Sequence, residues 1–135
     1  MRGLPAVGLS LILSACAVNA ADGEPITIAR PAFGGEALFH GTLELRRGCI
    51  VTDGDKPATV LFDPDVTLAD ARTGILDGPE GVFVPFGATV FAGYAVLREA
   101  GTGWRLAEIE AFFGVDIPDV CPTKEVARLH GFRTD

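Results

Sequence analysis

The sequence predicts a small, mainly β fold, either a barrel or a sandwich, with one short helix. The chain of 135 residues is long enough for one domain. Its 17 glycines and 9 prolines divide the apolar segments into short runs, as is typical of strands joined by tight turns. The third observation is the cysteine pair Cys49 and Cys121, which can tie the first part of the domain to its last part.

The beginning of the chain has the pattern of an export signal. Arg2 supplies positive charge, and residues 4–13 form an apolar run that is too short to span a bilayer. An aliphatic residue, two small residues and a cysteine then follow in order, Leu13-Ser14-Ala15-Cys16. This sequence resembles the lipobox of bacterial lipoproteins. The resemblance implies that residues 1–15 are a signal peptide and that Cys16 is lipidated before cleavage and becomes the new N-terminus.

The same stretch allows two other interpretations. Val18-Asn19-Ala20 fits the small-x-small pattern of an ordinary secretory signal, and cleavage after Ala20 would discard Cys16 and release a soluble protein. Cys16 can also be a buried cysteine at the end of a core segment. Under the lipoprotein interpretation, residues 16–36 are an anchor and flexible spacer, and residues 37–135 are the β domain. The resemblance also implies that Ala17, rather than Asp, after the lipidated cysteine favours the outer membrane, at its periplasmic face. The alternative is a periplasmic or secreted location.

Both export interpretations place the domain in an oxidising compartment, where disulfides persist. Cys49 and Cys121 are then the only two cysteines left in the domain, and their separation is 121 − 49 = 72 positions. A bridge closing a loop of this length contributes about 4 kcal/mol to stability. A reactive thiol or a zinc site is less well supported, because His40 and His130 are the only histidines.

The first expected element is one long strand over residues 41–54 (GTLELRRGCIVTDG), after a possible edge strand at 26–28. Strict alternation would place four apolar side chains on one face. These side chains are Leu43, Leu45, Cys49 and Val51. Arg47 falls on the same face, and the neighbouring Gly48 predicts a β-bulge that turns Arg47 outward.

Four further strand segments follow before the helix. Residues 58–62 (ATVLF) are rich in strand-forming side chains, and residues 75–76 and 82–86 flank a turn that contains two glycines. Residues 89–97 form a long strand, with Gly93 as a mark of sharp sheet curvature. We expect one face of this strand to carry Val90, Ala92, Tyr94 and Val96.

Residues 104–113 carry apolar side chains at helical spacing, and Gly114 can end that helix. Residues 116–122 contain two prolines and are expected to be irregular. Residues 125–132 suit either a short helix or a closing strand. We favour a strand beside the opening one, with Val126 and Phe132 on a common face. This inventory resembles an OB-like barrel, an analogy of fold that carries no function.

Few residues suggest chemistry. The sequence contains no nucleophile elbow, phosphate loop, His-Glu-x-x-His or Cys-x-x-Cys motif, so we expect no enzymatic activity, no cofactor and no metal. Three weaker candidates are a calcium site, a carboxylate pair and a histidine pair. The calcium site would comprise Asp53, Asp55, Asp63 and Asp65. The carboxylate pair would be Glu108 and Glu110 with Asp116, and the histidine pair would be His40 with His130.

The net charge of −7 disfavours nucleic acid as a partner. Most of the nine phenylalanines are expected in the core, and any that are exposed would mark a groove for a partner or an apolar ligand. We therefore expect a non-catalytic binding or assembly module that is anchored in the bilayer through Cys16 and docks on an envelope protein. The alternative is a secreted carrier or sensor of a small apolar ligand, and the least favoured is an envelope hydrolase.

Overall fold

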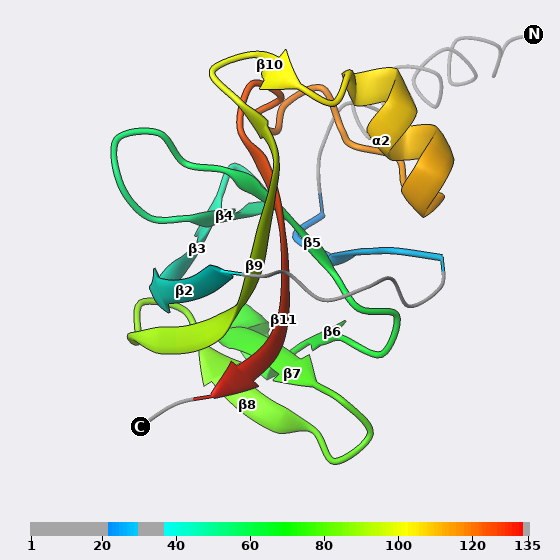
Figure 1. The fold of residues 1–135 in the computed structure, drawn as a ribbon. Helices are drawn as coiled ribbons and strands as arrows, with labels where there is room; N and C mark the ends of the chain where they lie inside the picture. The colour runs from blue at the N-terminus through cyan, green and yellow to red at the C-terminus, as the bar shows by residue number, and fades with distance from the viewer. Residues whose placement is uncertain (1–21, 30–36, 134–135) are drawn as a thin grey trace, which may run out of the picture.

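The computed structural model describes residues 22–29 and 37–133, which form two β-sheets and one α-helix (Figure 1). The larger sheet has eight strands and the smaller has three. This confirms the predicted class, a mainly β, disulfide-tied small barrel or sandwich with one short helix. The expected signal peptide, Cys16 and the alternative cleavage site after Ala20 lie outside the described residues. Among the residues described, no helix is long and apolar enough to cross a membrane.

The strands of the larger sheet follow one another in a ring. The order is β3 (Leu43–Arg46), β4 (Cys49–Thr52), β5 (Thr59–Phe62), β11 (Val126–Arg133), β9 (Val90–Glu99) and β2 (Ala37–Gly41). Thr42 alone separates β2 from β3, so the chain itself, and not strand pairing, links the two ends of this path. β11 is parallel to β5 and antiparallel to β9. The sheet is thus curled in the manner of the expected OB-like barrel.

Side chains on the two faces of the central strands form two apolar clusters. The inner cluster fills the barrel with Leu43, Ile50, Ala58, Val60, Phe62, Val66, Ile75, Val84, Val90, Ala92, Ala127, Leu129 and Phe132. The helix-side cluster lies on the outer face and contains Ile28, Cys49, Val51, Leu61, Leu97, Ile109, Phe113, Ile117, Cys121 and Val126. Because β5 is buried on both faces, its sequence is continuously apolar rather than alternating.

The single long strand predicted over residues 41–54 is wrong, because this stretch is a hairpin. β3 and β4 are antiparallel and are joined by Arg47 and Gly48, with φ of 54° and 79°. Two successive positive φ values define the type I′ turn that best matches the twist of paired strands. The turn replaces the expected bulge and changes the faces. Leu45 opposes Ile50 and packs on the inner cluster, whereas Cys49 belongs to the helix-side cluster.

The brief edge strand expected at 26–28 is present as β1 (Ile26–Thr27), which pairs in parallel with β5. β2 was not predicted, because its sequence ALFHG shows no clear alternation of apolar and polar side chains. The strand expected at 58–62 is confirmed as β5.

The smaller sheet contains β6 (Thr67–Leu68), β7 (Gly74–Asp77) and β8 (Val82–Pro85), with a short 3₁₀ turn at Asp70–Arg72. The predicted hairpin between residues 75–76 and 82–86 is confirmed as β7–β8. Gly74 is needed for the close approach of these strands. A Cβ at position 74 would lie 2.2 Å from the carbonyl oxygen of Val84.

β9 is confirmed as a long strand, but its predicted common face is wrong beyond Tyr94. Val96 is 48% exposed, whereas Leu97 is buried in the helix-side cluster. The cause is an irregularity in the pairing with β11. Val126 opposes Arg98, and the next residue, Ala127, opposes Val96, which leaves Leu97 without a facing residue.

The predicted helix is present as α2 (Leu106–Phe113), and it ends at Gly114 in the left-handed conformation with φ of 66°. It follows the short β10 (Thr102–Gly103). The segment 125–132 is a strand, as favoured. Its predicted neighbour is wrong, because β5 and β4 separate β11 from β3. A register shift near Gly131 also turns Phe132 into the inner cluster, on the opposite face from Val126.

Candidate functional site

The predicted disulfide is confirmed. Cys49, at the start of β4, is bonded to Cys121, and their α carbons are 5.7 Å apart. Both side chains are buried in the helix-side cluster, where the bond ties the segment after α2 to the sheet. A pocket of about 390 Å³ lies beside the bond on the outside of the barrel. Its lining is Arg46, Arg47, Val51, Pro57, Val120, Cys121 and Pro122.

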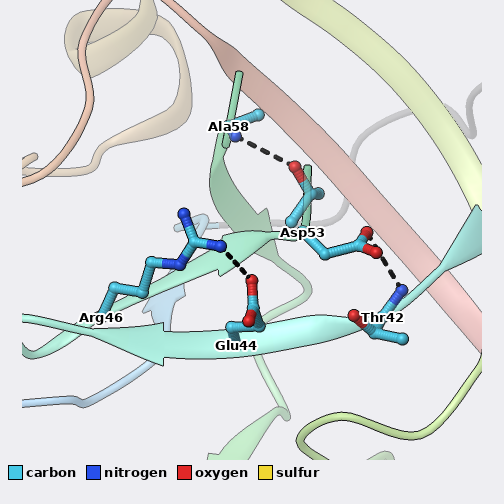
Figure 2. Close-up of polar contacts among 6 residues, drawn as sticks. Thr42, Glu44, Arg46, Asp53 and Ala58 are labelled. Carbon is cyan, nitrogen blue, oxygen red and sulfur yellow. Dashed lines mark hydrogen bonds and ion pairs between the residues drawn. The ribbon is translucent and has the colours of Figure 1, made fainter. Parts of the chain in front are cut away.

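The four aspartates considered for calcium do not form an ion site. Asp53 accepts a hydrogen bond of 3.3 Å from the backbone N–H of Thr42, close to the Glu44–Arg46 ion pair (Figure 2). Asp63 lies after β5 and is paired with Arg128 instead. Within residues 22–29 and 37–133, no three His, Cys, Asp or Glu side chains are arranged to hold a metal. The calcium hypothesis therefore has no geometric support.

The acidic side chains of α2 have structural roles. Glu108 accepts hydrogen bonds from the backbone N–H and the side chain of Arg105, which completes a capping box at the start of the helix. The backbone hydrogen bond from Arg105, followed by its side-chain bond, lowers the pKa of Glu108. Glu110 accepts a hydrogen bond of 3.0 Å from the backbone N–H of Ile117. These contacts fix the two ends of the helix and do not make a carboxylate pair.

His40 and His130 lie on strands that flank β9 on opposite sides. The ring of His40 stacks on Phe91 at a centroid distance of 4.5 Å and an angle of 3°. The ring of His130 covers Gly93, where a Cβ would lie 2.3 Å from its Nε2 atom. Gly93 is therefore small because an imidazole occupies the space of a side chain. The two histidines share the outer face of the sheet, but β9 lies between their strands.

A buried ion pair was missed by the sequence reasoning. The guanidinium of Arg128 is 2.8 Å from a carboxylate oxygen of Asp63, and the Arg128 side chain is only 4% exposed. Arg128 stands between apolar residues of β11, and no neighbouring residue in the sequence identifies Asp63 as its partner. The pair joins the middle of β11 to the end of β5.

Asp77 is a second missed group, and it links the smaller sheet to the barrel. Its carboxylate accepts a hydrogen bond of 3.3 Å from the backbone N–H of Phe132. Partial burial raises the pKa of Asp77, with smaller opposing effects from that hydrogen bond and from His130, and further raising by Asp65 and Asp63. A hydrolase would need a histidine near a carboxylate in a cleft. Neither Asp77 nor His130 lines the pocket beside the disulfide or the pocket at the end of α2.

Three aromatic rings contact one another at α2, two from the helix and one from the residue Trp104 before it. Trp104 precedes the helix, and its ring centroid lies 5.3 Å from that of Phe112 and 5.7 Å from that of Phe113. Phe113 is buried below, whereas Trp104 is 38% and Phe112 is 59% exposed. We call Trp104 and Phe112 the aromatic pair. A second pocket, of about 270 Å³, lies at the end of the same helix between residues 22–27 and residues 114–118.

The second exposed apolar surface is strand β8 at the opposite end of the domain (Figure 1). Within the described chain, β8 pairs only with β7, so its other edge has no strand beside it. Phe83 is 46% exposed and Val82 nearly as much, whereas Val84 on the same strand is fully buried in the inner cluster. We call Val82 and Phe83 together the β8 edge. An unpaired edge with apolar side chains is the kind of surface that proteins usually cover.

Comparison of the chain with protein-family models, with curated proteins and with solved structures finds no match in any of the three.

Proposed function

We propose that this chain is a lipid-anchored protein of the bacterial envelope whose β domain is a non-catalytic binding or assembly module. Cys16 is the attachment point, in line with the lipobox Leu13-Ser14-Ala15-Cys16. Replacing Cys16 with serine should release the protein from membranes into the soluble fraction. A wild-type chain that is already soluble would contradict the anchor.

The observation that carries the binding role is the β8 edge. A strand with an open edge can accept a partner strand through backbone hydrogen bonds, while exposed side chains such as Phe83 add apolar contact. The edge lies at the end of the domain away from α2 and the first described residues, so it would be presented away from the anchor (Figure 1). We propose an envelope protein that adds a strand to β8. Both pockets lie outside the barrel, so neither supports the alternative of an apolar ligand carried inside it.

The test is photo-crosslinking in cells, with a benzophenone amino acid in place of Phe83. The expected result is one discrete adduct with a second envelope protein, which is lost when Val82 is replaced with lysine, because a charge on an edge strand opposes strand addition. The matched control carries the same photoreactive group at Val96, which is 48% exposed on β9 against 46% for Phe83. The same adducts from both positions, or an adduct only with a second copy of the chain, would contradict the proposal.

A further inference from the structure

The aromatic pair, Trp104 before α2 and Phe112 on it, consists of two exposed rings in contact with each other. Trp104 and Phe112 meet edge to face, with 74° between their planes, and both rest on the buried Phe113. Their rings are therefore held together before any partner arrives, and covering them would cost little side-chain entropy. Indole and phenyl rings on a short amphipathic helix are the groups that settle at the boundary between lipid headgroups and acyl chains.

The start of the described chain is fixed against the same helix. The backbone N–H of Ala29 donates a hydrogen bond of 2.8 Å to the carbonyl oxygen of Phe113. Asp22 and Glu24 line a pocket together with Gly114 and Val115, which directly follow α2. The first described residue is therefore beside the C-terminal end of the helix that carries the aromatic pair.

The sequence limits how far a lipid on Cys16 can be from this helix. Cys16 precedes Asp22 by 22 − 16 = 6 residues. Six residues span at most about 20 Å even when fully extended. A bilayer that holds Cys16 is thus within about 20 Å of the pocket at the end of α2, whatever path residues 17–21 follow. α2 is the only α-helix in the described residues, and it stands at that end of the domain.

We propose that the aromatic pair inserts into the headgroup region of the bilayer beside the anchor and fixes the orientation of the domain on the membrane. The inference rests on the proposed lipidation of Cys16. The occupant is a zwitterionic lipid surface rather than an anionic one, because carboxylates outnumber cations at this end of the domain. Asp22, Glu24 and Asp116 line the adjoining pocket. Of the two arginines beside Trp104, Arg105 is paired with Glu108, and Arg98 donates hydrogen bonds to the carbonyl oxygens of Trp104 and Thr123. Two contacts, one covalent and one through the rings, would direct the β8 edge away from the membrane.

Trp104 is the only tryptophan in the sequence and therefore a built-in probe. The lipidated full-length protein is reconstituted into zwitterionic phospholipid vesicles and compared with the unanchored Cys16→Ser chain. The expected result is a blue shift of Trp104 emission, a several-fold lower quenching constant with aqueous iodide, and quenching by lipids that carry bromine near the headgroup. Replacing part of the lipid with an anionic phospholipid should reduce that quenching by bromine.

Phe112→Ser is the informative variant, because Phe112 is mostly exposed and its loss should leave the fold intact. It should lose most of the quenching by brominated lipid while remaining anchored through Cys16. Phe83→Ser, a matched phenylalanine at the far end of the domain, should behave as the wild type.

Three results would overturn the inference, each in a distinguishable way. A chain whose intact mass shows no acyl group would overturn the anchor, and with it this inference. A chain that is acylated and bound to vesicles, but whose Trp104 stays open to iodide and is not quenched by brominated lipid, would overturn the insertion while leaving the anchor in place. Stronger quenching on anionic vesicles would overturn the assigned lipid class.

Discussion

Reduction of the Cys49–Cys121 bond should remove a large share of the stability of the domain. The bond closes a loop of 72 residue positions. Chain-entropy theory assigns about 4 kcal/mol to a loop of that length, because the cross-link restricts the unfolded chain far more than the folded one. A domain of this size is stable by roughly 5–15 kcal/mol, so reduction should raise the unfolded fraction by about a thousandfold.

The assay is denaturant unfolding of the Cys16→Ser chain, which removes the third cysteine, with and without reductant. The reduced protein should unfold at a clearly lower denaturant concentration, and the difference in unfolding free energy should be about 4 kcal/mol. The Cys49→Ala/Cys121→Ala double variant is the control, since reductant should not change its midpoint. Equal midpoints for the oxidised and reduced protein would refute the reasoning.

Three other substitutions test separate parts of the fold. Gly74→Ala should lower stability by about 1–3 kcal/mol, seen as a lower Tm, because the added Cβ meets the backbone of β8; an unchanged Tm would contradict that close approach. Asp63→Asn should cost about 1–3 kcal/mol in denaturant unfolding by leaving the buried Arg128 without its carboxylate. Adding Arg128→Met to that variant should recover part of the loss, and no recovery would argue against the ion pair. Burial raises the pKa of Asp77 above its ordinary value of 3.8. The stability gained from protonating Asp77 is therefore fully present below pH 3.8 and is lost as the pH rises through the raised pKa. As the pH rises from about 3 to about 7, the wild type should lose stability relative to Asp77→Asn, and a pH-independent difference between the two proteins would contradict the prediction.

The sequence was most informative where local chemistry decides the structure. Gly114 ends α2 because glycine readily adopts the left-handed conformation, and the continuous apolar run in β5 reflects burial on two faces. The disulfide was predicted from the number of cysteines and from the expected export of the chain. None of these features depends on knowing which distant segment lies alongside.

The errors arose where a single residue changes the register. The sequence around Arg47 and Gly48 fits a β-bulge as well as a two-residue turn. Only the position of the partner strand decides between the bulge and the turn. The irregular pairing opposite Leu97 likewise depends on β11, which is distant in the sequence. Alternation along one strand cannot reveal either shift, because each is a property of a pair of strands.

The candidate surfaces depended still more on tertiary structure. The sequence indicated that exposed phenylalanines would mark a groove, but not that Phe112 is exposed while Phe113 is buried. The partnership of Arg128 with Asp63 joins residues that are 65 positions apart. Such pairs require the parallel alignment of β11 with β5, which no local pattern encodes.

The intact mass of the chain purified from the cell envelope tests the membrane anchor most directly. We predict a polypeptide that begins at Cys16 and carries additional mass from acyl groups on that residue. An unmodified polypeptide that begins at Ala21, after cleavage at Ala20, would contradict the anchor and the orientation of the domain that depends on it.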